Sequence, residues 1–137
     1  MTYVFDACAL LALVNKEKGA DVVQKLIYQA HMGTVSACIN IVNFLEVFYK
    51  LIQQKGIIAA DAFIKSILYA SPIQIIDTIS LALFCEAARF KTTYKLSLAD
   101  SLALANASCT DGTLVTADHH ELDAVDRTGT VHFLWIR

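Results

Sequence analysis

The chain has 137 residues, a length typical of one domain, and 56% of these residues are hydrophobic while 18% are charged. This much apolar material excludes a disordered chain, and five glycines and one proline exclude a collagen-like or low-complexity chain. The formal net charge of −2 argues weakly against nucleic-acid binding, because proteins that bind nucleic acids usually present a basic surface.

Two further classes of protein are not expected. The longest stretch without Lys, Arg, Asp or Glu covers residues 26–45, but it carries too many polar side chains for a membrane span. The N-terminus lacks the basic region and apolar run of a signal peptide. The four cysteines lie far apart among apolar neighbours and form no Cys-x-x-Cys pair. We therefore predict a cytoplasmic protein with reduced, buried thiols at Cys8, Cys38, Cys85 and Cys109.

Strands and helices are predicted to alternate along the chain. Short apolar runs predict strands over residues 2–6, 34–38, 73–76, 113–116 and 131–136. Apolar residues at helical spacing predict helices over residues 7–14, 20–31, 41–52, 59–69, 78–90, 98–109 and 119–125. No linker or repeat interrupts this pattern, so we predict one domain over residues 1–137. Its expected fold is a three-layer α/β/α sandwich around a mainly parallel sheet of about five strands.

Five acidic residues occupy unusual places in this pattern. Asp6, Asp77 and Asp118 come at or directly after the ends of predicted strands, where parallel sheets form their sites. Glu46 and Asp100 lie within apolar helices, where a carboxylate is costly unless something compensates its charge. A divalent metal ion compensates several carboxylates at once.

Each acid also has an explanation that involves no metal. Asp6 and Asp118 could cap the helices that follow them, and for Asp77 a helix cap is the favoured interpretation. Asp100 follows Ser97 at the spacing of a capping box. Glu46 lies in the middle of a helix and could form a weak ion pair with Lys50, four residues later.

Polar residues stand beside most of these acids and could orient them. Asn43 shares a helix face with Glu46, Ser97 lies one turn before Asp100, and Thr116 lies two residues before Asp118. The chain has no Gly-rich phosphate loop and no Gly-x-Ser-x-Gly motif, so nucleotide-hydrolysing and serine-hydrolase functions lose their main support.

Four segments together resemble the PIN-domain family of metal-dependent ribonucleases, and within it the VapC-type toxins. They contain the four acids in the order and spacing of that family and span nearly the whole chain: residues 3–12, 42–47, 96–105 and 114–118. Two positions depart from the family pattern. Cys8 stands where relatives often have Ser, Thr or Asn, and Glu121 stands where an aromatic residue is frequent.

The resemblance implies an α/β/α sandwich with acids at one end of the sheet, a Mg²⁺ or Mn²⁺ cofactor and hydrolysis of RNA. It also implies the toxin of a type II toxin–antitoxin pair, a homodimer held inactive by a cognate antitoxin protein. On this basis the acidic cluster is Asp6, Glu46, Asp100 and Asp118. We hypothesise that Asp6 and Asp100 bind the ion most directly, that Asp118 completes the cluster, and that Glu46 binds a second ion or holds the attacking water.

Several basic residues are candidates for contacts to the RNA backbone, although each could equally be a solvated helix end: Lys16, Lys18, Arg89, Lys91 and Lys95. Tyr94 could stack on a base. We expect His119 and His120 on a surface helix, Trp135 in core or dimer packing, and a homodimer interface along residues 41–69.

Three other functions stay open from the sequence. The chain could be a housekeeping RNA-processing nuclease, or a PIN-like module that has lost catalysis and only binds a partner. A receiver-type phosphoacceptor domain is less favoured, because the expected pair of acids after the first strand is absent: Asp6 is followed by Ala7.

Overall fold

The computed structural model describes all 137 residues and contains one five-stranded sheet in which every pair of neighbouring strands is parallel. The spatial order of the strands is β3-β2-β1-β4-β5. The strands are β1 (Thr2–Phe5), β2 (Ser36–Asn40), β3 (Gln74–Ile76), β4 (Thr113–Thr116) and β5 (His132–Trp135). The helices are α1 (Ala7–Val14), α2 (Ala20–His31), α3 (Ile41–Lys55), α4 (Ile57–Ala70), α5 (Leu81–Thr93), α6 (Leu98–Cys109) and α7 (His119–Asp126).

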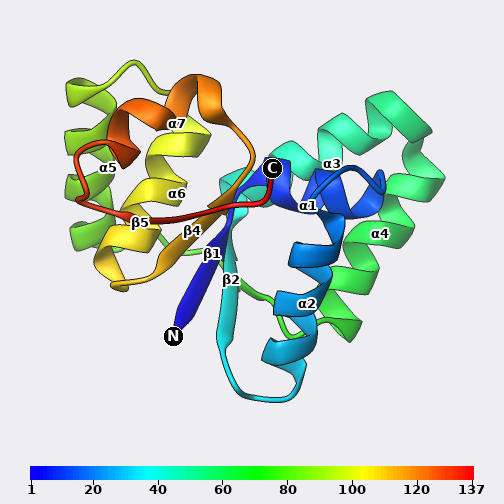
Figure 1. Cartoon of the computed structure of the whole chain (residues 1–137). Helices are drawn as coiled ribbons and strands as arrows, with labels where there is room; N and C mark the ends of the chain where they lie inside the picture. Colours follow the sequence, from blue (N-terminus) through cyan, green and yellow to red (C-terminus); the bar gives the residue numbers. More distant parts are fainter.

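Helices cover both faces of this sheet. Figure 1 shows α1 to α4 on one side of the strands and α5 to α7 on the other. The central strands alternate between two cores: Phe5 and Val115 belong to the core under α1 to α4, whereas Val4 and Leu114 belong to the core under α5 to α7. Burial on both faces explains why these strands are continuous apolar runs. The predicted fold class, a three-layer α/β/α sandwich with a parallel sheet, is confirmed.

The strand order reverses its direction of growth at β1. From β1 the chain adds β2 and then β3 on one side, whereas β4 and β5 lie on the other side. In sheets of this kind a crevice forms at the carboxyl ends of the strands where the order reverses, and ligands bind there. Here that point lies between the ends of β1 and β4, which run in register from Tyr3 opposite Thr113 to Phe5 opposite Val115.

Several predicted boundaries differ from the structure by one to three residues, and two of these differences have a clear local reason. The second strand begins at Ser36 rather than at residue 34, because the backbone N–H and the hydroxyl of Thr34 both bond to the Gln29 carbonyl at the end of α2. The fifth helix begins at Leu81 rather than at residue 78, because Ser80 caps it by accepting a bond from the Leu83 N–H at 3.2 Å.

The favoured interpretation of Asp77 as a helix cap is therefore also wrong. Ser80, three residues later, takes that role, and the exposed Asp77 carboxylate accepts a bond only from the hydroxyl of Thr78.

The expectation for the cysteines is only partly met. All four thiols are unpaired, but Cys85 and Cys109 are exposed, and of the four only Cys38 is buried. Apolar neighbours in sequence do not bury a helical residue, because only every third or fourth position of a helix faces the core. No helix of the structure has both the length and the apolar character needed to cross a membrane.

Candidate functional site

Asp6 lies between the end of β1 and the first turn of α1, and its side chain is only 1% exposed. One carboxylate oxygen, Oδ1, accepts a bond from the Ala9 N–H at 2.8 Å, so Asp6 caps α1. The other oxygen, Oδ2, accepts a bond from the hydroxyl of Thr116 at the end of β4. Asp6 is therefore both a helix cap and a buried carboxylate at the point where the strand order reverses.

Thr116 joins the ends of the two neighbouring strands. Its hydroxyl donates to Asp6 and accepts a bond from the Asp118 N–H at 3.0 Å. Asp118 in turn caps α7, because its Oδ1 accepts from the N–H groups of His120 and Glu121 at 3.1 and 3.4 Å. This short chain of hydrogen bonds fixes the position of Asp118 relative to Asp6.

Burial dominates the electrostatics of Asp6. Removal from water raises the pKa of its carboxyl from 3.8 to about 7, although the bonds from Thr116 and Ala9 favour the charged form. The negative charges of Asp118 and Glu46 contribute to this rise. An ionised Asp6 is thus costly in the absence of a cation.

Asp100 lies in the first turn of α6, one turn after Ser97. The Ser97 hydroxyl accepts from the Asp100 N–H at 3.1 Å and donates to Asp100 Oδ2 at 2.8 Å. In a full capping box the acid would accept the Ser97 N–H. Here Glu121 of α7 accepts that N–H at 2.9 Å, so the carboxylate of Asp100 is not used to cap the helix backbone.

Glu121 is a fifth acid at this edge. From the sequence it stands out only as a departure from the family pattern, and its bond to Ser97 was not expected. Burial, together with a hydrogen bond to Glu121, raises the pKa of Asp100 to about 8, while the same bond lowers the pKa of Glu121. Of the two carboxyls, Asp100 therefore holds a proton more readily than Glu121.

Glu46 and Asn43 lie on α3, which begins directly after β2. Glu46 is half-buried and forms an ion pair with Lys50 at 2.7 Å, as the metal-free explanation predicts. Asn43 is fully buried and donates to the Ala99 carbonyl in α6 at 3.0 Å. Its Oδ1 has no hydrogen-bond partner.

The thiol of Cys8 shows that the acids lie near one another. Burial, with a contribution from the negative charges of Asp6, Asp118 and Asp100, raises its pKa to about 12, while the charge of Lys50 acts in the opposite direction. The negative charge of Glu46 in turn contributes to the raised pKa of Asp6. The charges of Asp6, Asp100 and Asp118 thus act on the Cys8 thiol and that of Glu46 acts on Asp6, although no three His, Cys, Asp or Glu side chains are arranged as a ready metal site.

The residues at this edge nonetheless fit a divalent ion. Mg²⁺ prefers carboxylate and amide oxygens and keeps several waters of its own. The buried Asp6 carboxylate lacks a cation, and the buried Asn43 Oδ1 lacks a partner. The Lys50 ammonium provides the positive charge next to Glu46.

The predicted basic contacts differ in availability. Arg89 is held by Glu86 through two bonds of 2.9 and 2.7 Å, and Lys16 follows the end of α1 that is remote from Asp6. Lys91 in the last turn of α5 and Lys95 in the loop between α5 and α6 are exposed and form no ion pair. This loop leads directly to Ser97.

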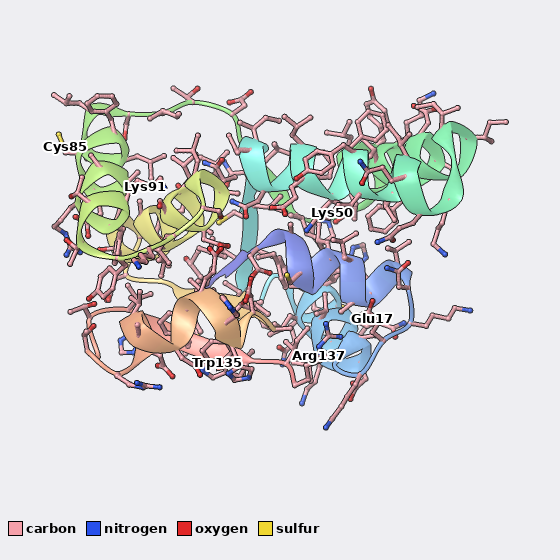
Figure 2. The ribbon with its side chains drawn as sticks, turned by 90° about the horizontal axis from the view of Figure 1, so that it is seen from above. Glu17, Lys50, Cys85, Lys91, Trp135 and Arg137 are labelled. Carbon is pink, nitrogen blue, oxygen red and sulfur yellow. The ribbon has the colours of Figure 1, made fainter.

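The C-terminal residues pack beside the site. His119 and His120 are exposed on α7, as predicted, and the His119 ring stacks on half-exposed Trp135 with ring centres 4.0 Å apart. Arg137 forms an ion pair with Glu17, and Figure 2 shows these two side chains next to each other.

Comparison with protein-family models finds one match, to the PIN domain, over residues 3–128. The chain belongs to the PIN-domain family. Among solved structures, VapBC2 from Rickettsia felis, bound to a promoter DNA fragment, matches with 18% identity, a TM-score of 0.76 and 98% coverage of both chains. A toxin–antitoxin complex from Klebsiella pneumoniae matches with 17% identity, a TM-score of 0.65 and 98% coverage of both chains.

VapBC-1 from nontypeable Haemophilus influenzae matches with 13% identity and a TM-score of 0.71, over 99% of this chain and 98% of the other. At such low identity these structures show a shared fold. No curated protein sequence matches this PIN domain.

Proposed function

We propose that this PIN-domain protein is a divalent-metal-dependent endoribonuclease and the toxin of a toxin–antitoxin pair. The observation that carries the proposal is the chain of hydrogen bonds from Asp118 through Thr116 to Asp6 at the point of strand reversal. Through these two hydrogen bonds the Thr116 hydroxyl ties the Asp6 carboxylate to the backbone of Asp118, at the edge of the sheet where ligands bind.

The roles of the acids follow from their places. Asp6 and Asp100 would hold one Mg²⁺ or Mn²⁺ ion, and Asp118 would complete the cluster. When bound, the ion supplies a Lewis acid for the RNA phosphate and makes a bound water more acidic. Glu46 would accept a proton from the attacking water or hold a second ion. Thr116 and Ser97 would keep the carboxylates of Asp6 and Asp100 in place. Asn43 bonds to the Ala99 carbonyl rather than to Glu46, so it would act by holding α3 against α6.

The charge balance supports an anionic substrate at this edge. A divalent cation reverses the local field of the acids, so that phosphate is attracted rather than repelled. We propose Lys91 and Lys95 as backbone contacts near the cluster. Lys16 is a more distant candidate, and Arg89 would first have to leave Glu86.

The experiment is cleavage of a panel of structured RNA and DNA oligonucleotides by the purified protein with Mg²⁺, Mn²⁺ or a chelator. We expect RNA cleavage with either metal and none with the chelator. Asp100→Asn should abolish cleavage, whereas Asp61→Asn, which removes an exposed carboxylate on α4, should not. Retained cleavage by a folded Asp100→Asn variant would contradict the proposal, and absence of cleavage in the wild type would favour a PIN module that only binds a partner.

The proposed partners are an antitoxin protein and a second copy of the chain, in the cytoplasm. The solved structures with the same fold include a toxin–antitoxin complex and VapBC structures. This chain also exposes apolar side chains on α3, including Leu45, which is 56% exposed. A gene for a small DNA-binding protein next to this one would favour the toxin over a housekeeping RNA-processing nuclease.

A further inference from the structure

The loop between α5 and α6 borders an open hollow of about 630 Å³. Lys91, Tyr94 and Lys95 line it from the loop side, and Ser97 and Glu121 line it where the loop meets α6 and α7. Figure 2 shows Lys91 between α5 and α6. The volume falls within the range of about 300–1,000 Å³ of sites for small ligands, so one nucleotide can be accommodated.

This hollow adjoins the acidic cluster through hydrogen bonds. Ser97 donates its hydroxyl to Asp100, and Glu121 accepts the Ser97 N–H. The residues that border the hollow on this side are therefore the same residues that hold a proposed metal ligand. A chain seated in the hollow would continue directly to the acids.

Two lysines of the lining supply positive charge to the hollow. Lys91 donates to the Leu96 carbonyl at 2.6 Å, which fixes its ammonium group while leaving two of its three N–H donors available. Lys95 is exposed and makes no hydrogen bond or ion pair with any side chain. Both lysines are thus free to contact a phosphate.

Tyr94 gives the hollow a flat apolar surface. Its ring stacks against buried Phe90 with a centre-to-centre distance of 6.4 Å, and the ring itself is half-exposed. A supported aromatic ring of this kind can stack on any base of a single strand, because every base has a π-face.

We propose that this hollow binds one nucleotide of single-stranded RNA next to the cleaved bond, with its phosphate on Lys91 and Lys95 and its base on Tyr94. The inference rests on the proposed nuclease function and names the subsite that delivers RNA to the acids. Glu121 makes a free phosphate ion a poor fit, because its charge would repel the anion. A nucleotide also has hydroxyl and amino groups, and these can donate hydrogen bonds to the Glu121 carboxylate.

The test measures binding of fluorescein-labelled ten-nucleotide oligo(U) and oligo(A) RNA by anisotropy, in a chelator so that no cleavage occurs. Lys95→Ala should weaken binding of both RNAs and reduce the slope of log K against log salt by about 0.7, as expected for one lost phosphate contact on a single strand. Lys25→Ala is the matched control, because Lys25 is also exposed and unpaired but lies on α2. It should leave affinity and slope unchanged.

The aromatic contact is tested with two variants at Tyr94. Tyr94→Leu should weaken RNA binding by roughly tenfold or more, whereas Tyr94→Phe, which keeps the ring, should bind as the wild type does. Circular dichroism melts establish that the variants are folded. If folded Lys95→Ala and Tyr94→Leu variants bind both RNAs as tightly as the Lys25→Ala control, the subsite proposal is overturned.

Cleavage assays with Mg²⁺ on the same preparations separate the two proposals. Wild-type cleavage with no effect of Lys95→Ala or Tyr94→Leu on RNA affinity would reject the subsite and keep the nuclease. Loss of RNA affinity in these variants without any cleavage by the wild type would reject the nuclease and keep the subsite as an RNA-binding surface.

Discussion

Thr116 is the residue that ties the acids of β1 and β4 together. Its buried hydroxyl donates to Asp6 and accepts from the Asp118 N–H, so it satisfies two groups that have few alternative partners. Sequence reasoning placed Thr116 beside Asp118, and the structure shows that it also bonds to Asp6, 110 residues away along the chain.

Thr116→Val tests this link, because it keeps the shape of the side chain and removes the hydroxyl. We expect the free energy of unfolding to fall by about 1–3 kcal/mol, since buried groups are left unsatisfied. Metal-dependent cleavage should fall as well. Thr116→Ser, which restores the hydroxyl, should recover most of both. Urea denaturation and cleavage rates measure the outcome, and full activity in a stable Thr116→Val variant would show that this link is dispensable.

Asp6 makes the stability of the metal-free protein depend on pH. Its pKa is about 7 in the folded state and 3.8 without burial, so the folded state keeps a proton that the unfolded state has released. The free energy of unfolding should therefore fall as pH rises from about 4 to about 8, because charging Asp6 opposes folding.

Asp6→Asn removes this contribution. Compared with the wild type in a chelator, the variant should gain at least about 1 kcal/mol of relative stability between pH 5 and pH 8. Urea denaturation at the two pH values measures the difference. An identical pH dependence in wild type and variant would mean that Asp6 is charged in the folded protein without help from a metal.

At the scale of elements, two helices begin with nearly identical serine caps. Ser97 before α6 and Ser80 before α5 have the same backbone conformation, and each accepts a bond from the N–H three residues later, at 3.1 and 3.2 Å. They differ in one respect, because only Ser97 also donates to an acid of the cluster, Asp100.

Replacing each of these two serines by alanine separates the effect of a lost helix cap on stability from an effect on cleavage. Ser97→Ala and Ser80→Ala should each lower the free energy of unfolding by about 1 kcal/mol, the usual value for a lost cap. Only Ser97→Ala should also reduce cleavage at saturating metal. Equal activities in the two variants would show that the bond from Ser97 to Asp100 has no role in the reaction.

The elements could be predicted from the sequence wherever a local signal sets the boundary. Gly33 and Gly56, both with positive φ, follow the ends of α2 and α3, where glycine is the usual stop signal. The start of α5 could not be predicted, because Asp77 and Ser80 are both good caps. The buried face that includes Leu83 and Phe90 begins close after Ser80, and the chain uses that cap.

The sequence alone suggests which acids form the candidate site, but it does not show which side chains contact them. The order and spacing of the four acids point to one edge of the sheet. Nothing local joins Glu121 to Ser97, 24 residues apart, since their bond depends on how α7 packs against the start of α6. The ion pair of Glu46 with Lys50 was an open alternative, and the sequence could not show that a metal-free structure adopts it.

At the scale of the whole molecule, an apolar surface extends across both helical layers. One groove includes Phe44, Leu45 and Leu68 of the α3–α4 hairpin, and a second includes Phe84 and Leu98 of α5 and α6. Val42 lines both grooves, so the two grooves adjoin at this residue. Patches of this kind on a small protein are typical of interfaces.

Leu45→Glu tests whether a second copy covers this surface. We expect the wild type to form a dimer and the variant to be monomeric, because a buried carboxylate without a partner opposes association. Light scattering coupled to size exclusion gives the mass, with Ile58→Glu, a change at an exposed residue of the same hairpin outside both grooves, as the control. A dimeric Leu45→Glu variant would place the interface elsewhere.

The central claim is that acids from distant parts of the chain hold one cation at the point of strand reversal. Isothermal titration of Mn²⁺ into the protein at pH 8 tests this claim most directly. The account predicts saturable binding by the wild type and by the control Asp61→Asn, and loss of that binding in Asp6→Asn. Unchanged Mn²⁺ binding by Asp6→Asn, or no binding by the wild type, would contradict it.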